Sequence, residues 1–483
     1  MPAITSLGIG SGVDINSMVS QLVALESRPL VQMRNEANAL QTQVSSYGQL
    51  SSLFSALQGA ANKLNSSSLW AQSTATSSDD SAVSIVGGSS AAAGSYSVSV
   101  DKLATHQTVV STSAYASATE PVGSGTLTLD IGTWEPPPMD FVPQVGRTPT
   151  TVTVTASDTL ASLRDKINGM GAGVSASIVT DRDGARLSLR SSNSGAANGF
   201  RLSVADDDGG AAGDGAGLSR FAYDPTGGST TMERKVAAED ARATVNGISV
   251  VSASNELSTV VEGLTLRLRK EGFGSADISV NSDRDAVKTA IQGFADAYNV
   301  LTKSITDQTR YDPTSRVGGP LQGDSAATGL QRQLRNLLNT PSGASATFAR
   351  LSDIGLELQR DGTLKVDDAK LGSATANLPE LKKAFANSET GAPGNDGFAR
   401  RYSALAGQVL GIDGSLTTRT EGLRSRITRN GENQTHVQER VERYQARLVA
   451  QYTAMDASLS KLNALSSYVT QQLNALNNSN NRS

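Results

Sequence analysis

Two stretches of the chain, one near each end, carry apolar residues in alternating steps of three and four. The first runs from Leu30 to Leu64 and the second from Val437 to Leu462. This spacing is typical of a coiled-coil seam, a narrow apolar stripe that a second helix covers. The residues assigned to the two seams are Leu30, Met33, Leu40, Val44, Leu57, Val437, Val441, Tyr444, Leu448, Met455, Leu459 and Leu462.

We expect these two helices to pair antiparallel with each other. At about 1.5 Å per residue, the helix from Leu30 to Leu64 and the helix from Val437 through the continuing apolar positions to Leu476 would each be about 50 to 60 Å long, longer than a small domain is wide. Pairing brings the chain ends together and makes everything between them an insertion. The alternative is two independent helices on separate cores, although such helices usually show a wider apolar face.

Shorter apolar stripes lie outside this pairing, at both ends of the chain. A helix should begin after Asp14, a good N-cap, and should break before Pro29, because a residue preceding proline disfavours the helical conformation. With little of the subunit left to cover them, these stripes predict legs that bind a partner; the alternative is terminal helices that cap their own domain. The predicted leg residues are Ile15, Met18, Val19, Leu22, Leu25, Val469, Leu473 and Leu476.

Between about residues 77 and 282 the apolar period changes to two, which indicates strands. Asp183-Gly184 and Asn246-Gly247 predict hairpin turns, and Leu160, Leu163 and Ile167 mark one short helix. The predicted strands are 82–86, 96–100, 107–112, 126–131, 152–155, 174–180, 186–190, 243–245, 248–251, 264–268 and 278–280. The proline-rich segment 134–149 is predicted to be an exposed loop, and the Asp- and Gly-rich segment 206–217 a mobile one.

Helical spacing returns after residue 282, with Ser282 as the expected cap, and again after Asp324 and at 398–409; a small hairpin around Asp361-Gly362 lies between. The predicted fold class is therefore α+β and multidomain. The expected domains are terminal leg helices (1–28 and 453–483), a helical coiled-coil domain with a small hairpin (29–76 and 283–452), an inner β-rich domain (77–112 and 237–282) and an outer inserted β-rich domain (113–236).

Charge and composition remove several classes of partner. Of 483 residues, 42 are Lys or Arg and 46 are Asp or Glu, with no strongly basic block, so nucleic acid is not an expected partner. The absence of Cys removes disulfides and thiolate chemistry. We expect no signal peptide and no membrane insertion, which leaves the cytosol or export by a route that reads no such signal.

The sequence offers little for catalysis, metal binding or cofactors. His106 and His436 stand apart, with no second ligand nearby. The run 181–184 resembles half of a calcium loop but lacks a third carboxylate and a glutamate at the twelfth position, so it is explained as a turn. Asp206, Asp207, Asp208 and Asp214 are expected to be solvated. The glycines at 169–173 follow a helix, the reverse of a phosphate-binding loop, and predict a C-cap. We therefore expect no enzyme and no cofactor.

Several motifs, in order along the chain, resemble the flagellar filament cap family, also called hook-associated protein 2. They are the opening 7–14 segment with Pro29-Leu30, the helix and hairpin of 159–189, the segments 243–248 and 263–266, which resemble a motif shared with flagellin relatives, and 351–367. The resemblance covers about residues 4 to 476. Its departures are the proline-rich segment near Trp134 and the acidic loop near Asp206.

The resemblance implies a secreted, ring-shaped homo-oligomer at the distal tip of the bacterial flagellum. Its terminal helices would be legs among flagellin subunits, and its β-rich domains a plate that holds arriving flagellin. Export through the flagellar type III apparatus and a cytosolic export chaperone bound to the C-terminal segment are also implied. Two alternatives stay open: another flagellin-like or hook-associated filament protein, and an adhesin whose β-rich domains bind host glycans.

Overall fold

The chain forms two units. The structure, a computed structural model, describes residues 14–87, 91–135, 140–209, 214–314 and 316–480, with the backbone alone for residues 87 and 476–480. One unit comprises Met1–Leu69 with Arg284–Ser483, and the other is Trp70–Asp283. Residues 7–13 of the opening motif lie outside the described residues. The β-rich middle of the chain is thus an insertion into a helical unit, in agreement with the predicted fold class.

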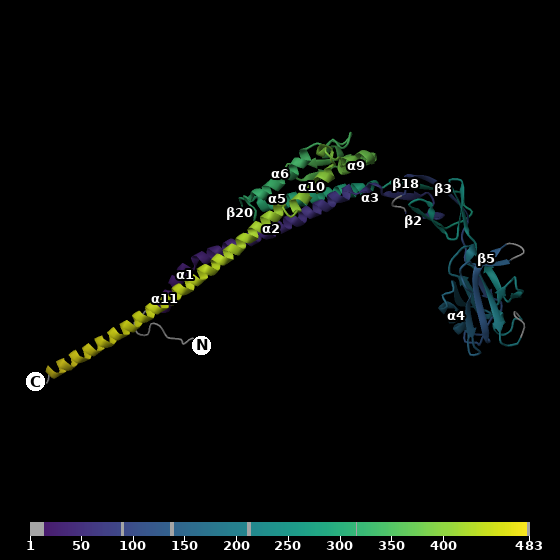
Figure 1. Cartoon of the computed structure of the whole chain (residues 1–483), viewed down its shortest axis with the longest axis horizontal. Helices are drawn as coiled ribbons and strands as arrows, with labels where there is room; N and C mark the ends of the chain where they lie inside the picture. The colour runs from purple at the N-terminus through teal and green to yellow at the C-terminus, as the bar shows by residue number, and fades with distance from the viewer. Residues whose placement is uncertain (1–13, 88–90, 136–139, 210–213, 315, 481–483) are drawn as a thin grey trace. The chain divides into compact units, whose positions relative to one another are not determined.

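The helical unit consists of long helices with a few short ones and two small hairpins (Figure 1). Its helices are α1 (Ile15–Glu26), α2 (Arg28–Asn65), α3 (Ser67–Trp70), α5 (Arg284–Thr309), α6 (Ser325–Asn339), α7 (Leu351–Ile354), α8 (Asp368–Ala374), η3 (Thr375–Asn377), α9 (Leu378–Ala386), η4 (Pro393–Asn395), α10 (Phe398–Leu410) and α11 (Ser415–Asn480). Its hairpins are β19 (Tyr311–Asp312) with β20 (Val317–Gly318), and β21 (Leu356–Leu358) with β22 (Leu364–Val366).

The break between α1 and α2 falls at Ser27, as the following proline predicts. Asp14 caps α1, since its Oδ1 accepts a hydrogen bond of 2.9 Å from the N–H of Ser17. Pro29 lies in the first turn of α2, where its missing N–H has no helical partner to lose. Two separate helices therefore form where the sequence predicts them.

Helices α2 and α11 run antiparallel, as predicted. Arg440 of α11 pairs with Glu26 at 3.0 Å, and Arg426, earlier in α11, pairs with Glu36, later in the N-terminal segment, at 3.2 Å. The extent of the pairing differs from the prediction. Helix α11 begins at Ser415, and the first half of α11 is the part that contacts α2.

The second half of α2 is covered by α5 and α10 instead of α11. Gln308 of α5 donates a hydrogen bond of 3.1 Å to Gln49, and Ser403 of α10 donates one of 2.6 Å to Asn62. The prediction that the two seams cover each other along their whole length is therefore wrong. A heptad stripe requires an apolar neighbour, but it does not specify which helix supplies it.

An aromatic core closes the helical unit around α5. Phe294 lies edge-on to both Phe385 and Tyr402, with ring centroids 6.4 and 5.2 Å apart. The predicted hairpin β21–β22 is held on α5 by Asn299, whose side chain pairs with the N–H and C=O of Leu364 at 2.6 and 2.8 Å. Ser282 is not the cap of α5, because it lies in a strand of the other unit.

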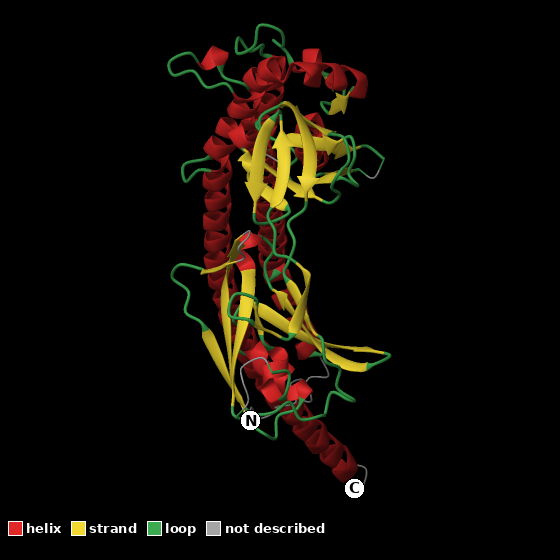
Figure 2. Ribbon diagram, turned by 90° about the vertical axis from the view of Figure 1, so that its right-hand side faces the viewer, coloured by secondary structure: helices red, strands yellow, loops and turns green. Residues whose placement is uncertain are grey.

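The β unit contains one regular α-helix and many short strands, which gather in two groups (Figure 2). Its elements are β1 (Ser73–Ser77), β2 (Val83–Gly87), β3 (Gly94–Lys102), β4 (Thr108–Ser111), β5 (Gly125–Glu135), β6 (Asp140–Pro143), β7 (Thr150–Val154), α4 (Leu160–Gly169), β8 (Val174–Asp181), β9 (Gly184–Ser191), η1 (Ala196–Asn198), β10 (Gly199–Asp206), η2 (Gly217–Phe221), β11 (Tyr223–Asp224), β12 (Ser229–Thr230), β13 (Met232–Val236), β14 (Ala241–Val245), β15 (Ile248–Ser252), β16 (Glu256–Val261), β17 (Leu264–Leu268) and β18 (Ala276–Ser282).

The inner β domain has two sheets on one apolar core. The order is β1-β18-β3-β14-β15 in one sheet and β16-β17-β2 in the other, and alternate residues of both sheets are buried between them. Residues 73–76 were predicted to belong to the helical domain, but Ser73 pairs with Ser282 in this sheet. That predicted boundary is therefore several residues too late.

The outer β domain also has two sheets, with α4 against the same core. Their orders are β12-β11-β10-β5-β6, with β7 also on β5, and β13-β4-β9-β8. The predicted boundary at 112 assigns residues 108–111 to the inner domain. They belong to the outer domain instead, because β4 pairs with β9 and β13. The capping box of Thr159 and Ser162 begins α4, and Gly171 and Gly173, with φ of +60° and +82°, end it as predicted.

The proline-rich segment is not simply a loop. Trp134 lies in β5, and β6 pairs with β5 with Trp134 opposite Phe141, while Pro136 to Pro138 lie outside the described residues. A short edge strand tolerates Pro143 at its end, because no ladder hydrogen bond is required there. The acidic segment 206–217 is described except for 210–213, and Asp206 belongs to the end of β10.

Candidate functional site

Helix α1 packs against the middle of α11. Ile15 and Val19, which are 1% and 7% exposed, form an apolar cluster with Leu448, and Tyr444, Val449 and Tyr452 pack around it. The expectation that the α1 stripe has little in its own subunit to cover it is therefore wrong for these two residues. These two residues pack against the part of α11 that was predicted to pair with α2.

The other side of the α1 stripe stays open to solvent. Met18 is 40% exposed and Leu25 54% exposed. Together with Leu22, Arg28 and Tyr452 of α11 they line a shallow groove of about 580 Å³. This groove is a largely apolar surface between two helices, of a size that accepts side chains of a further helix.

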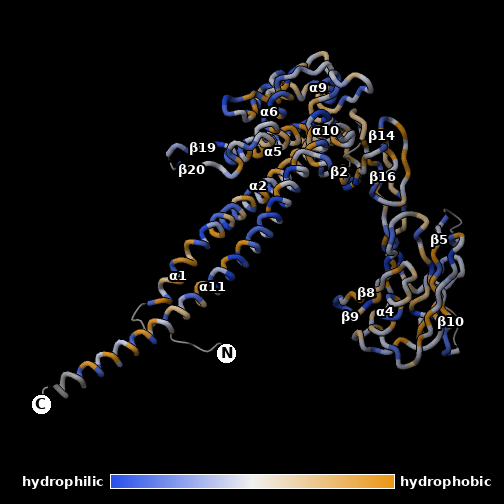
Figure 3. Tube along the Cα trace, turned by 60° about the vertical axis from the view of Figure 1, so that its left-hand side comes forward, coloured by the Kyte–Doolittle hydropathy of each residue, from blue (hydrophilic) through white to orange (hydrophobic). Residues whose placement is uncertain are grey.

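Beyond this contact, α11 continues with its apolar stripe exposed (Figure 3). The large apolar residues there are between 40% and 60% exposed, and they recur at helical spacing: Met455, Leu462, Leu465, Tyr468, Val469 and Leu473. The side chain of Leu476 lies outside the described residues. We call residues 448–480 of α11, with α1, the leg.

The α11 part of the leg is nearly free of charge. Between Leu448 and Asn480 the only charged residues are Asp456 and Lys461, whereas the preceding stretch carries Arg440, Arg443 and Arg447. Flanking charges normally fix the partner and register of a coiled coil. The stripe beyond Leu448 has few such charges beside it.

The predicted seam residues divide into three groups. Leu30, Leu40, Val441 and Leu448 are buried within the helical unit, as is Leu57, which lies in the part of α2 that faces α5 and α10. Met33, Val44, Val437, Tyr444 and Leu459 are half-buried. Met455 and Leu462 are exposed, so they belong to the leg surface and not to an internal seam.

The prediction missed the start of the α2–α11 contact and part of the leg. Leu416 and Leu423 of α11 are buried, and they continue the heptad spacing N-terminally from Val437 through Ile427. Leu465 and Tyr468 are exposed on the leg. The same spacing was the available signal in both cases, since the stripe simply runs further in each direction.

A polar layer interrupts the α2–α11 contact. Asn430 is buried, donates to Glu36 at 3.3 Å and accepts from Gln434 at 2.6 Å, and Arg426 pairs with the same Glu36. A buried polar group of this kind restricts a helix pair to the register in which it is satisfied. The layer lies within the α2–α11 contact, since Leu30 and Val441 are buried beyond it in the direction of the leg.

No catalytic arrangement is present in the described part of the chain. His106 lies with Nδ1 2.9 Å from the carbonyl oxygen of Ser191, and His436 is exposed on α11. Within the same residues there is no cluster of three or more His, Asp or Glu that could hold a metal. No described helix is both long and apolar enough to cross a bilayer.

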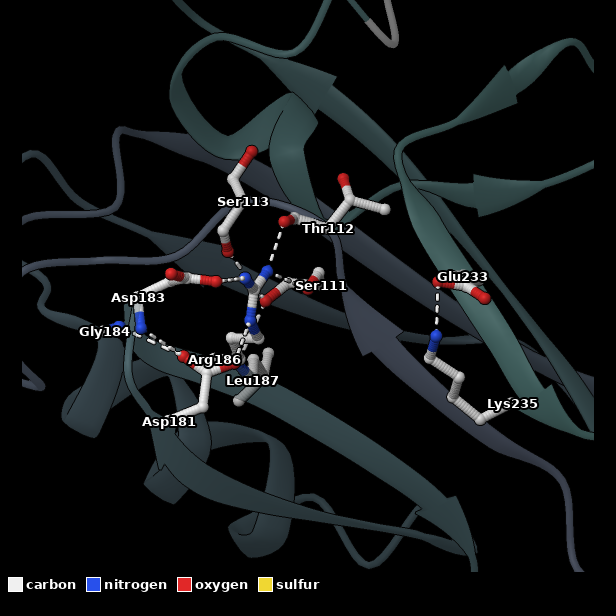
Figure 4. Close-up of polar contacts among 10 residues, drawn as sticks. All are labelled: Ser111, Thr112, Ser113, Asp181, Asp183, Gly184, Arg186, Leu187, Glu233 and Lys235. Carbon is white, nitrogen blue, oxygen red and sulfur yellow. Dashed lines mark hydrogen bonds and ion pairs between the residues drawn. The ribbon is translucent and has the colours of Figure 1, made fainter.

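The two acidic segments have structural roles. In the β8–β9 hairpin the Asp181 carboxylate accepts from the N–H groups of Asp183 and Gly184, and Arg186 connects it to the carbonyl oxygens of Ser111 and Thr112 (Figure 4). These hydrogen bonds, that of Arg186 first, lower the pKa of Asp181. Its oxygens are thus occupied by the turn, as the turn interpretation predicts.

The expectation that Asp206 is solvated is wrong, because both of its carboxylate oxygens accept hydrogen bonds from the backbone. Its Oδ2 accepts from the N–H of Ser219 at 2.8 Å and its Oδ1 from the N–H of Asp208 at 3.3 Å. The carboxylate therefore fixes the start of η2 against the end of β10.

Comparison with known proteins agrees with this architecture. The family models for the flagellar hook-associated protein 2 N-terminus and C-terminus match residues 11–107 and 238–464. The flagellin hook IN motif matches residues 144–193, and not the segments 243–248 and 263–266 to which we assigned the motif shared with flagellin relatives.

The chain is 31% identical over 495 residues to the flagellar hook-associated protein 2 of Escherichia coli (strain K12), covering 100% of both chains. It is 28% identical over 487 residues to the B-type flagellar hook-associated protein 2 of Pseudomonas aeruginosa, covering 98% of each. It is also similar to the crystal structure of the D1-D2-D3 domains of the flagellar cap protein from Escherichia coli, with a TM-score of 0.59 and 28% identity, over 78% of this chain and 99% of that chain.

The chain is thus a helical unit with inserted β domains, and its last helix carries an exposed apolar stripe. The chain belongs to the flagellar hook-associated protein 2 family.

Proposed function

We propose that this chain caps the distal end of the bacterial flagellar filament, promotes flagellin polymerisation there and prevents the loss of unpolymerised flagellin. Family membership over the full chain supports this function. The observation that carries it is the leg, whose apolar stripe is exposed in the single chain and is therefore available to a partner. The protein acts outside the cell, at the filament tip, as an oligomeric cap.

The leg is the part that binds the filament. Its α11 stripe and the groove beside Met18 and Leu25 offer an apolar surface at helical spacing, which a flagellin helix with a matching stripe would cover. Ile15, Val19 and Leu22 position α1 for this contact, because they attach it to α11. Val469 and Leu473, and Leu476 beyond them, extend the contact toward the end of the chain.

The low number of charged residues on the leg is consistent with a cap that must change its partner helices as the filament grows. With only Asp456 and Lys461 beside the stripe, several registers of a partner helix are nearly equal in electrostatic energy. Binding by apolar burial is also screened little by salt. The polar layer around Asn430 keeps the bundle in one register while the leg exchanges partners.

Other partners belong to the same proposal. The β-rich domains form the plate over the export channel, and the subunits form a ring. The chain leaves the cell through the flagellar type III apparatus, and a cytosolic export chaperone covers the exposed C-terminal stripe before export. Covering that stripe would prevent premature association through its exposed apolar side chains.

The test is complementation of a strain that lacks the gene. Leu462→Asp with Leu465→Asp places charge on the stripe and should abolish filament growth while leaving the thermal unfolding of the purified chain unchanged. Ser467→Asp with Gln471→Asp is the matched control, since both residues are exposed on the same helix outside the stripe and add the same charge. Loss of growth in the control, or normal growth in the stripe variant, contradicts the assignment of the leg.

A further inference from the structure

A rigid turn of the outer β domain displays one apolar side chain. Val145, which is 100% exposed, is the second residue of a β-turn closed by a hydrogen bond of 3.2 Å from the N–H of Arg147 to the carbonyl of Gln144. Gly146 has a φ of +82°, which glycine adopts without strain. The N–H of Gln144 is bound to the carbonyl of Ile131 at 2.8 Å, and Nη2 of Arg147 to that of Ala172 at 2.5 Å.

Hydrogen bonds fix both sides of the 144–147 turn, so a partner that binds it has little conformational entropy to remove. Val142, on the neighbouring edge strand β6, is also exposed. The turn 144–147 therefore presents a preorganised apolar tip with a cationic residue beside it.

The inner β domain has an apolar groove of about 310 Å³ with an anionic residue at its rim. It is lined by Tyr96, Val245, Ile248, Val250, Val260 and Glu262. It lies between β15 and β16, the neighbouring edges of two sheets that do not pair with each other. Ile248 is 69% exposed at its mouth, and the turn at one end is fixed by Asn246, whose Oδ1 accepts from the N–H of Ser97 at 2.8 Å.

We propose that the 144–147 turn of one copy docks into the β15–β16 groove of a neighbouring copy. This contact rests on the proposed function, because the proposed cap is a ring of subunits. Within a single copy the groove is not occupied by the turn, since Val145 is fully exposed. A contact between two different surfaces of the same chain is heterologous, and such a contact generates a closed ring when the rotation that relates neighbouring copies closes on itself.

Charge supports a second copy as the occupant. Arg147 follows the displayed valine by two residues, and Glu262 stands at the rim of the groove; both are exposed. Neither has an ion pair with another described residue. Docking would place the guanidinium beside the carboxylate, which selects this orientation against the reverse one.

The first test uses disulfide trapping in the full-length chain, which contains no Cys of its own. Val145→Cys and Ile248→Cys proteins are mixed under mild oxidation. We expect a cross-linked dimer from the mixture, at least tenfold above the amount from either protein alone, because the contact is heterologous. Val179→Cys, another exposed valine of the outer domain, replaces Val145→Cys as the matched control and should give no such dimer with Ile248→Cys.

The second test reverses the charge at the rim of the groove and leaves Arg147, which anchors the turn, in place. Glu262→Arg should weaken self-association, measured by sedimentation velocity, by about fivefold or more, because it places like charges together, and Glu262→Gln should weaken it less. Absence of the mixed cross-link, equal cross-linking of the control, or unchanged self-association of Glu262→Arg overturns this interface. If the interface fails while the variants still restore filaments in the deletion strain, the cap function stands; failure of the wild-type gene to restore filaments contradicts the function itself.

Discussion

Arg419 donates two hydrogen bonds to Oδ2 of Asp324, from Nε at 3.1 Å and from Nη2 at 2.8 Å. The other oxygen, Oδ1, accepts from the N–H groups of Ala326 and Ala327 and so caps α6. One buried carboxylate thus fixes the start of α11 and the start of α6 together. The leg is an extension of a helix whose origin is anchored in the bundle.

Replacing Arg419 should lower the free energy of unfolding more than replacing Asp324. Burial alone would raise the pKa of Asp324, but the neighbouring Tyr47 hydroxyl, the Arg419 guanidinium and the Ala326 N–H outweigh it, and the pKa is lowered. Arg419→Met leaves a buried carboxylate without its cation and should cost about 2–3 kcal/mol in urea unfolding followed by helical circular dichroism. Asp324→Asn keeps a capping side chain, leaves only a partly exposed cation and should cost about 1 kcal/mol. The reverse order contradicts the role assigned to Arg419.

Asp158 should make the outer domain sensitive to acid. Burial would raise its pKa, but Lys166 Nζ at 2.5 Å and hydrogen bonds from Thr155 and Ser162 outweigh it, so the pKa lies well below the usual range. A carboxylate with a depressed folded-state pKa contributes stability that is present above its unfolded pKa of about 4 and is lost as pH falls toward the folded value.

Asp158→Asn measures that contribution. It should lower the stability by about 2 kcal/mol at pH 7, and the difference from wild type should shrink below about pH 4. Thermal unfolding at pH 7, 5 and 3 gives both values. A difference that does not change with pH shows that the charge of Asp158 is not what the site requires.

Gln107 should hold the two sheets of the outer domain together. It is fully buried, its Oε1 accepts from Trp134 Nε1 at 3.0 Å and from the N–H of Phe200 at 3.1 Å, and its Nε2 donates to the carbonyl of Phe200 at 2.7 Å. Gln107→Leu has a similar volume and should cost about 3 kcal/mol, because buried polar groups lose their partner.

Tryptophan fluorescence during urea unfolding is the measurement, with Gln144→Leu as an exposed control from the same domain that should change stability by less than about 0.5 kcal/mol. A cost for Gln107→Leu no larger than that of the control would show that the network adds nothing.

Elements with strong local signals could be predicted from the sequence. The hairpins at Asp183-Gly184 and Asn246-Gly247, the break before Pro29 and the Asp324 cap all follow from the chemistry of one or two residues. Strand β10 was missed, although Phe200, Leu202 and Val204 alternate along it. Strand β13 was missed because Glu233, Arg234 and Lys235 hide its period.

Partners of the apolar stripes could not be predicted in the same way. Leu40 and Leu57 have the same heptad spacing on one helix, yet the first lies in the part of α2 that faces α11 and the second in the part that faces α5 and α10. The choice depends on where α11 begins, at Ser415, and on the aromatic core around Phe294, neither of which the stripe encodes. The covered face of α1 was missed for the same reason.

Leu40 and Leu448 should respond differently to the same substitution. Leu40→Asp places a charge in the bundle and should cost about 4 kcal/mol in global stability. Leu448→Asp should instead release α1, because Leu448 packs against Ile15 and Val19. Hydrogen exchange should then lose protection in residues 15–26 while the global unfolding changes little. Leu462→Asp, on the exposed stripe, is the control for both. A global loss with Leu448→Asp would place α1 within the bundle's cooperative core.

The most direct measurement of the cap function is the fate of flagellin in a strain that lacks this gene. Filament length by electron microscopy and monomeric flagellin in the medium are measured after complementation with the wild-type gene, the Leu462→Asp, Leu465→Asp variant, or the Ser467→Asp, Gln471→Asp control. We expect filaments with the wild type and the control, and with the stripe variant exported flagellin that stays monomeric. Filaments of normal length on the uncomplemented strain or with the stripe variant would contradict it.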